Sequence, residues 1–338
     1  MTLEINVSCI PNTGYLDTPK FLSFALHLTT TISTPVHILG IYFLLFKTPV
    51  QMSSVKWQIV NLHSWIILFD YSVGVLTVPV ILLPMFAGFP NGVLTYFKVP
   101  AVYQAVIVLT FLGYVIVSTV AVFENRFYII CNNWVYKNYT NSRQLWLLLH
   151  YIAVALVLAL FCYLAPYQMT AVMDVYRNLP CLSENMYHSD VFVLADNHLF
   201  HLIIIVIFIM LTCFEILLFV GCCIRDIFVR IKSTKMSQRT VQMQKTFFLA
   251  FLTQMTVPMF MLTFPFFYAW MAVIHSYHNQ AMTNIAIIIS SLHGFVSTIV
   301  MLLVHRPYRE ELLRLVFRKS IGKVSHQSNF IENRHVVL

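Results

Sequence analysis

Charged residues are scarce in this chain, and their scarcity excludes an ordinary water-soluble fold. Only 10% of the 338 residues are Asp, Glu, Lys or Arg, and 59% are hydrophobic. A typical soluble domain has about 25% charged and about 45–50% apolar residues. Phe, Leu, Ile and Val are spread along most of the chain rather than collected into one core. The composition therefore predicts a single polytopic membrane domain.

Signatures of enzymes and metal sites are missing as well. The chain contains no HExxH, GxSxG or Gly-rich phosphate-loop motif. Its seven cysteines form no CxxC pair and no zinc-finger spacing. Two pairs with helical spacing, His198/His201 and His275/His278, would suit zinc or copper, but histidine is also common at membrane interfaces. We expect no enzymatic activity, no cofactor and no functional metal site.

Seven segments are long and apolar enough to cross a bilayer, which takes about 20 residues in helical form. Residues 246–305 contain no Lys, Arg, Asp or Glu, but the polar stretch HSYHNQ at 275–280 divides them into two spans. The predicted spans are roughly 21–46, 57–86, 99–124, 145–168, 197–224, 246–274 and 280–305. The predicted fold is an all-α membrane protein, a seven-transmembrane helix bundle between an N-terminal segment, 1–20, and a tail, 306–338.

The few basic residues predict the orientation of this bundle. Loops 47–56, 126–143 and 225–245 and the tail 306–338 contain eighteen Lys or Arg residues, against three in the N-terminus and the other loops. Cytoplasmic loops carry the excess of Lys and Arg, so we expect the N-terminus to be extracellular. Because the basic residues lie in short juxtamembrane loops rather than on one soluble face, the net charge of +8 does not indicate nucleic-acid binding.

Glycosylation and disulfide formation depend on this orientation. The sequon at Asn6 would lie outside and be usable, whereas the sequon at Asn138 would be cytoplasmic and silent. Cys9 and Cys181 are the cysteines that fall clearly on the oxidising side. A Cys9–Cys181 disulfide is therefore a hypothesis, with two free thiols as the alternative.

Ionisable residues inside the predicted spans are few and mark candidate sites, because they are costly at membrane depth and usually face the bundle interior. The acids there are Asp70, Glu124 and Glu215. Asp70 lies near the middle of its span, where it would face a polar stripe on the seventh span or serve as a protonated structural carboxyl. That stripe consists of Ser290, His293, Gly294 and Ser297.

The stretch FENRFY, 123–128, follows about twenty-five residues without formal charge. Arg126 falls at headgroup level, where it could simply snorkel and follow the positive-inside bias. That bias does not explain Glu124, which lies two residues deeper. An acid beside a base instead suggests a breakable lock at the inner end of the third span.

Two further features concern the sixth and seventh spans. Pro258 and Pro265 interrupt the sixth span and form either a hinge or a bend that improves packing. After Pro307, apolar and basic residues alternate at helical spacing. This pattern predicts a short amphipathic eighth helix at about 308–319, lying on the anionic inner leaflet of the lipid bilayer.

Together these features describe the architecture of a G-protein-coupled receptor, and several stretches resemble one family. They are TPVHILGIYFLLFKTP at 34–49, SVKWQIVNLHSWIILFD at 54–70, FENRFY at 123–128 and NQAMTNIAIIISSLHGFVSTIVMLLVHRPYRE at 279–310. The chain resembles the serpentine receptor class H group of nematode chemoreceptors through nearly all of its membrane domain. The resemblance implies a chemosensory receptor for an odorant or pheromone-like ligand, in the ciliary or plasma membrane of sensory neurons, that signals through a heterotrimeric G protein.

Rhodopsin-like receptors offer a second comparison. Glu124-Asn125-Arg126 is similar to their acid-Arg-Tyr motif, with an Asn inserted, and Tyr308 lies where an Asn-Pro-x-x-Tyr motif would be expected. Their Cys at the outer start of helix three is missing here, which makes Cys9 the candidate partner of Cys181. We therefore predict that Glu124, Asn125, Arg126, Pro258 and Tyr308 form the switch that couples to the G protein.

A ligand pocket is expected in the outer half of the bundle, among helices three, five, six and seven. Pockets of this kind are mostly apolar with a few polar anchors, so a small apolar or amphipathic ligand is predicted. The candidate anchors are Tyr103, Gln104, His198, Asn279 and Asn284. A seven-helix ligand-gated cation channel and a small-molecule transporter are the alternatives. The charge distribution disfavours the first, and the absence of an internal repeat disfavours the second.

Overall fold

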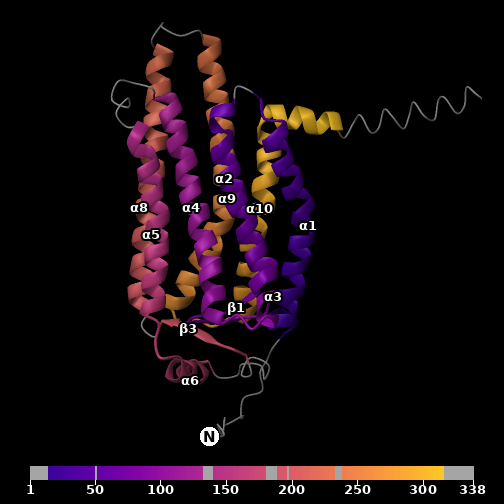
Figure 1. Ribbon diagram of the computed structural model, residues 1–338, viewed down its shortest axis with the longest axis vertical. Helices are drawn as coiled ribbons and strands as arrows, with labels where there is room; N and C mark the ends of the chain where they lie inside the picture. Colours follow the sequence, from indigo (N-terminus) through magenta and orange to yellow (C-terminus); the bar gives the residue numbers. More distant parts are fainter. Residues whose placement is uncertain are drawn as a thin grey trace, which may run out of the picture.

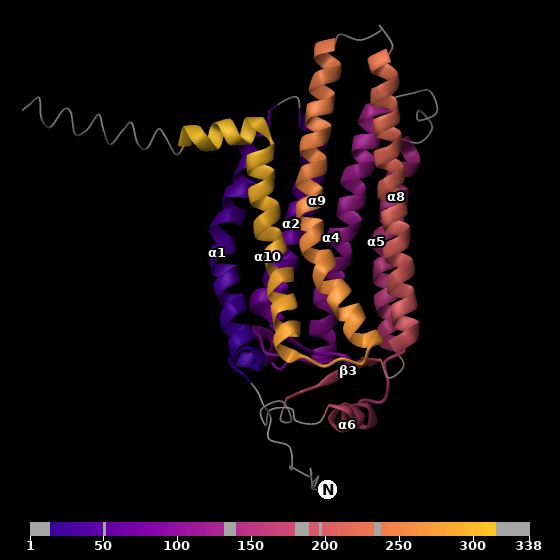
Figure 2. The same ribbon diagram turned by 180° about the vertical axis from the view of Figure 1, so that it is seen from behind.

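The computed structural model describes residues 14–49, 52–131, 140–179, 189–195, 198–232 and 238–315. Seven helices in these ranges are long and apolar enough to cross a membrane, and they form an elongated bundle (Figures 1 and 2). They are α1 (Pro19–Phe46), α2 (Ser53–Tyr71) with its π-helical continuation η3 (Ser72–Thr77), α4 (Ala101–Ile130), α5 (Thr140–Tyr163), α8 (His198–Lys232), α9 (Gln238–Ile274) and α10 (Gln280–Val304). The predicted bundle of seven long apolar helices is confirmed.

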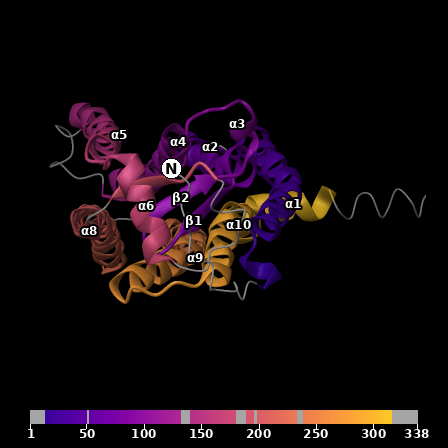
Figure 3. The same ribbon diagram turned by 90° about the horizontal axis from the view of Figure 1, so that it is seen from below.

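The prediction of an all-α fold is wrong in one respect, because a small antiparallel sheet covers one end of the bundle. Its strands are β1 (Pro79–Leu82), β2 (Phe86–Pro90) and β3 (Phe192–Ala195), in the order β1-β2-β3. Figure 3 shows the sheet across the bundle axis, near the short helix α6 (Gln168–Asn178). We call this the sheet end and the opposite end the tail end.

The sheet replaces the last third of the second predicted span, 57–86, and proline is the cause. A residue that precedes proline is disfavoured in the helical region. Val78 precedes Pro79 and adopts a left-handed conformation with φ 42°, so the helix stops at Thr77. The strands that follow alternate in burial, and Val80, Leu82, Ala87 and Phe89 pack into the core of the bundle.

The helices at the tail end extend beyond the predicted spans. Helix α4 continues to Ile130 rather than residue 124, and within the predicted loop 225–245 α8 continues to Lys232 and α9 begins at Gln238. Figures 1 and 2 show α8 and α9 projecting past the other helices. Hydropathy indicates where a helix leaves the apolar layer, but it does not indicate where the helix ends. Lys, Arg and Gln are good helix formers, so a helix that contains them can continue into water.

The chain turns sharply at the end of α10. Residues 306–315 form a further helix that runs across the end of the bundle (Figures 1 and 2). Tyr308 and Leu312 of this helix pack against the core, while Arg309 and Arg314 are exposed. This segment therefore has the two faces of an amphipathic helix.

Burial differs strongly among the seven helices. Half of the most apolar window of α4 is buried, but only 11% of that of α5 or α8. Because these windows are apolar, α5 and α8 present faces that a lipid bilayer would solvate. Helix α4 is thus the most enclosed of these three, and it packs mainly against α2, α5 and α8.

Candidate functional site

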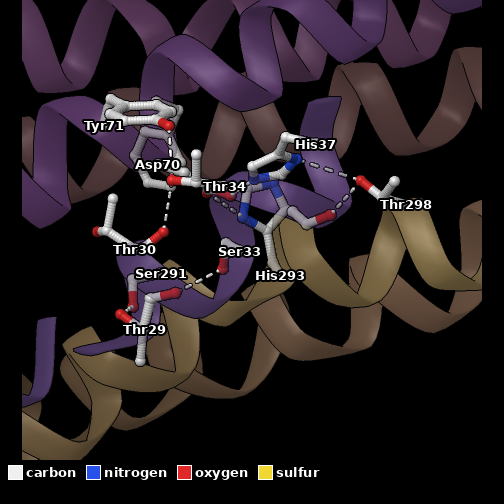
Figure 4. A network of polar contacts seen from close by, with 12 residues as sticks. Thr29, Thr30, Ser33, Thr34, His37, Asp70, Tyr71, Ser291, His293 and Thr298 are labelled. Atoms are coloured by element: carbon white, nitrogen blue, oxygen red, sulfur yellow. Dashed lines mark hydrogen bonds and ion pairs between the residues drawn. The ribbon is translucent and has the colours of Figure 1, made fainter. Parts of the chain in front are cut away.

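A buried carboxylate joins three helices in the middle of the bundle. Asp70 of α2 is 3% exposed. Its Oδ2 lies 3.0 Å from His37 Nε2 of α1, and its Oδ1 lies 3.3 Å from His293 Nδ1 of α10 (Figure 4). His37 Nε2 and Asp70 Oδ2 are joined by a hydrogen bond, whereas the hydrogen-bond partner of His293 Nδ1 is Ser290 O at 3.0 Å. Asp70 thus meets His293 from the predicted polar stripe and, in addition, a histidine that the sequence argument did not use.

Hydroxyl groups extend this polar network along α1 and α10. Thr298 Oγ1 lies 3.3 Å from His37 Nδ1 and 3.5 Å from His63 Nε2. Towards the sheet end, Thr29 and Ser291 are joined by a hydrogen bond of 3.2 Å (Figure 4). The network therefore bridges α1, α2 and α10. His37 could have been found from the sequence, because an imidazole within a span needs a polar partner.

A small internal cavity adjoins the network. Its volume of about 20 Å³ suffices for roughly one water molecule. Among its lining residues are His293, Pro258 of α9 and Thr119 of α4. His293 Nε2 has no hydrogen-bond partner in the part of the chain that the structure describes. The predicted hinge residue Pro258 and the polar network thus face the same cavity.

Glu124 forms an ion pair with a residue that the sequence argument assigned to a loop. Arg143 of α5 donates to Glu124 through Nε and Nη2, both at 2.7 Å, and through Nη2 to Asn125 Oδ1 at 3.0 Å. Its guanidinium also lies 4.1 Å from the ring centroid of Tyr128. The interpretation of Glu124 and Arg126 as a paired lock is wrong, because residues two positions apart lie about 200° apart around a helix.

Arg126 does not snorkel to a headgroup layer but is directed into the bundle. The helix continues past it to Ile130, and its guanidinium lies 5.3 Å from the ring centroid of Phe251 on α9. Its Nε and Nη2 are buried without a hydrogen-bond partner among the described residues. Arg126 is thus a half-buried cation whose guanidinium lies against an aromatic ring.

The start of the tail surrounds Arg126 with neutral groups. His305 follows the last residue of α10, and its Nε2 donates to Gln254 Oε1 at 2.6 Å. Burial, followed by the charge of Arg126, lowers the pKa of His305 to about 4. The buried Tyr308 hydroxyl lies 2.8 Å from Thr48 Oγ1. Arg126, His305 and Tyr308 therefore form one cluster that joins α4, α9 and the tail helix, which we call the tail-end cluster.

Comparison with known proteins agrees with this architecture. A family model described as serpentine type 7TM GPCR chemoreceptor Srh matches residues 17–318, which include all seven spans and the tail-end cluster. The chain belongs to the Srh family. Serpentine receptor class H-72 of Caenorhabditis elegans is 26% identical over 322 residues, which cover 95% of this chain and 91% of that protein. The chain is thus a multi-pass membrane protein and a chemoreceptor rather than an enzyme.

Four of the five predicted ligand anchors of this Srh receptor have side chains that the structure describes. Tyr103 is 61% exposed on the outer surface of α4. Gln104 is buried and donates to Val99 O at 2.8 Å. Asn279 caps α10 by accepting a hydrogen bond from Met282 N, and Asn284 donates to Leu16 O. These contacts give Gln104, Asn279 and Asn284 structural roles.

Several predicted features of the Srh receptor lie outside the described residues. They are the glycosylation site Asn6, the cysteines Cys9 and Cys181 and the side chain of His198. Within the described ranges, no group of three or more His, Cys, Asp or Glu side chains could hold a metal ion.

Stability of the receptor should fall at mildly acidic pH because of His305. Its pKa is about 4 in the folded chain, against an ordinary 6.5, so the unfolded chain binds the proton more tightly. The contribution of His305 is complete above about pH 6.5 and is lost progressively down to about pH 4. Between pH 7 and pH 5, the thermal unfolding temperature of purified receptor should fall less for the His305→Gln variant than for the unchanged receptor. A His27→Gln variant at an exposed position serves as the control and should behave like the unchanged receptor.

Proposed function

We propose that this Srh receptor binds a small apolar or amphipathic molecule at its sheet-end half and activates a heterotrimeric G protein at its tail end. The N-terminus would be extracellular, the tail cytoplasmic, and the protein would reside in the plasma membrane, including that of sensory cilia. The observation that carries the proposal is that the Nε and Nη2 atoms of Arg126, beside α9, are buried without a hydrogen-bond partner among the described residues.

The environment of Arg126 depends on the position of α9. Buried charged groups without hydrogen-bond acceptors are costly, and the ring of Phe251 lies 5.3 Å from this guanidinium. Displacement of the tail end of α9 would move Phe251 and free the Nε and Nη2 donors. Carbonyl or carboxylate groups of a G-protein segment could then accept these hydrogen bonds, so the displaced conformer would be stabilised by the partner.

Pro258 offers the means by which a ligand could bias that displacement. A proline within a helix removes one backbone hydrogen bond and favours a bend, and this one faces the cavity next to His293. A ligand shifts an equilibrium only through its differential affinity for the two conformers. A molecule that enlarges this cavity would favour a different bend of α9, while the Glu124–Arg143 pair keeps α4 and α5 together.

Removal of the Arg126 guanidinium should abolish coupling without loss of the folded receptor. In cells that express the chain, an Arg126→Ala variant should give at least tenfold less ligand-stimulated nucleotide exchange on the G protein at equal surface level, because about 1.4 kcal/mol of partner binding corresponds to a factor of ten. The control is Arg177→Ala, which removes a 74% exposed arginine at the opposite end. Equal signalling by Arg126→Ala and the control would reject this assignment.

The orientation has a separate test, which also addresses the disulfide. Mass spectrometry of receptor from cells should find an N-glycan on Asn6 and none on Asn138. The same digest without reduction should contain a peptide that links Cys9 to Cys181. A glycan on Asn138 would reverse the proposed orientation, and two alkylated thiols would exclude the disulfide.

A further inference from the structure

A hydrogen-bonded pair of side chains joins α5 to α8, two helices that the polar network around Asp70 does not reach. His150 Nε2 of α5 lies 3.2 Å from Glu215 Oε2 of α8, and the two side chains are 21% and 27% exposed. We propose that this pair is a binding site for one proton, and that the contact between the two side chains exists only while the proton is bound. The proposal does not depend on the ligand or on the G protein.

The backbone of α5 determines which nitrogen of His150 carries a hydrogen. His150 Nδ1 lies 2.9 Å from Trp146 O. A backbone carbonyl oxygen only accepts hydrogen bonds, so Nδ1 is the donor in this contact. A neutral imidazole carries a single N–H, which leaves a lone pair on Nε2, the nitrogen beside Glu215. The Trp146 ring, whose centroid lies 4.3 Å from that of His150, supports the imidazole in this orientation.

The contact with Glu215 therefore needs one more proton than neutral His150 and ionised Glu215 provide. An ionised carboxylate also offers only lone pairs, so these two forms would face each other without a hydrogen between them. The hydrogen bond of 3.2 Å forms either when His150 is an imidazolium that donates through both nitrogens or when Glu215 is a carboxylic acid that donates to Nε2. Both arrangements hold the same proton and have a net charge of zero.

The depth of the pair in the membrane favours the same protonation state. Glu215 follows Leu199, where its apolar span begins, by sixteen residues, which is about 24 Å along a helix. The hydrocarbon core of a bilayer is about 30 Å thick, so the carboxyl group lies within it. Only 11% of the apolar window of α8 is buried, and the pair is partly exposed at this lipid-facing surface. A net charge there is costly, and the shared proton removes it.

Other titratable groups on the adjoining helix faces do not replace the proton. On α5, Arg143 precedes His150 by seven residues, about 10 Å along the helix, and it is bound to Glu124 of α4 through two hydrogen bonds. On α8, the Cys222 thiol follows Glu215 by the same interval. Helix α9 carries no Lys, Arg, Asp or Glu within its apolar span. The pair thus depends on its own proton for neutrality.

A double-mutant cycle measured over a range of pH tests the proposal, because it separates the His150–Glu215 interaction from every other titrating group. His150→Phe keeps a ring against Trp146, and Glu215→Leu removes the carboxyl group. Thermal unfolding in phosphatidylcholine nanodiscs is measured from pH 5 to pH 10 for the unchanged receptor, both single variants and the double variant. The coupling should be about 2–4 °C in unfolding temperature at low pH. It should vanish as the pH rises, because loss of the proton leaves two opposed lone pairs.

Glu215→Gln distinguishes a proton site from an ordinary hydrogen bond. An amide can donate to Nε2 of neutral His150 or accept from Nε2 of an imidazolium, so its coupling to His150 should be the same at every pH. The matched control is the contact between Trp146 and Phe219 of the same two helices, whose ring centroids are 6.1 Å apart. Neither ring titrates, so the cycle of Trp146→Leu and Phe219→Leu should not change with pH.

Three results would overturn the proposal. The first is a His150–Glu215 coupling that stays constant from pH 5 to pH 10, and the second is the absence of coupling throughout that range. The third is a coupling that falls in parallel with that of Trp146 and Phe219, because the two helices would then separate at high pH for a reason other than this proton.

Discussion

An Arg143→Ala receptor is expected to unfold far more easily than the unchanged protein. The substitution leaves the Glu124 carboxylate, whose side chain is 5% exposed, without its two hydrogen bonds from Arg143. Removal of one partner from a buried ion pair costs about 3–5 kcal/mol. We expect the lower end of that range, because the Arg143 side chain is 19% exposed.

Thermal unfolding of purified receptor measures the stability change. The unfolding temperature of Arg143→Lys should lie between those of Arg143→Ala and the unchanged receptor, because lysine keeps the charge but cannot form the bidentate contact. Replacing both Glu124 and Arg143 with leucine should restore much of the lost stability, since no unpaired charge remains.

The control for this pair is Arg314→Ala at the same end of the bundle. Arg314 is 77% exposed and meets Glu311 at 3.4 Å. An exposed pair of this kind contributes little, so the variant should unfold like the unchanged receptor. If Arg143→Ala and Arg314→Ala unfolded at the same temperature, the Glu124–Arg143 contact would not hold α4 to α5.

The second large effect is expected from a single methyl group at Gly294. A Cβ there would overlap Asp70 Oδ2 and lie 2.6 Å from Ile66 Cγ2. Movement of either neighbour is restricted, because Asp70 Oδ2 is hydrogen-bonded to His37 and both side chains are buried. Overpacking of a filled core costs about 1–3 kcal/mol, and here it would also break the polar network that joins α1, α2 and α10.

Gly221→Ala provides a matched control with the opposite sign. Gly221 lies in α8, and a Cβ at this position would meet nothing within 4 Å. Alanine favours a helix over glycine by about 0.8–1.0 kcal/mol, so this variant should be slightly more stable. Relative to the unchanged receptor, the unfolding temperature and the surface expression should therefore fall for Gly294→Ala and rise slightly for Gly221→Ala. A Gly294→Ala receptor as stable as Gly221→Ala would show that α2 and α10 are not in close contact at Asp70.

The sequence by itself determined the class of this protein, because the bilayer imposes its requirement on each segment separately. A helix that crosses a membrane must satisfy its own backbone and be apolar for about 20 residues. The seven spans and the Srh resemblance could therefore be read from local composition and from stretches such as the one at 279–310. Asp70 could be predicted to face the stripe that contains His293 and Gly294, because few polar groups at membrane depth are available as partners for a carboxyl group.

Only the tertiary structure decided which partner each polar group takes. Glu124 and Arg126 are close in the sequence, but their side chains point to different sides of α4. Glu124 therefore contacts Arg143, and Arg126 contacts Phe251. His37 reaches Asp70 across 33 positions of the chain, and no local pattern encodes that distance. The pairing of β2 with β3 likewise joins segments that are far apart in the sequence. Hydropathy is a property of one segment, whereas a contact is a property of two, which is why the fold could be predicted and the partners could not.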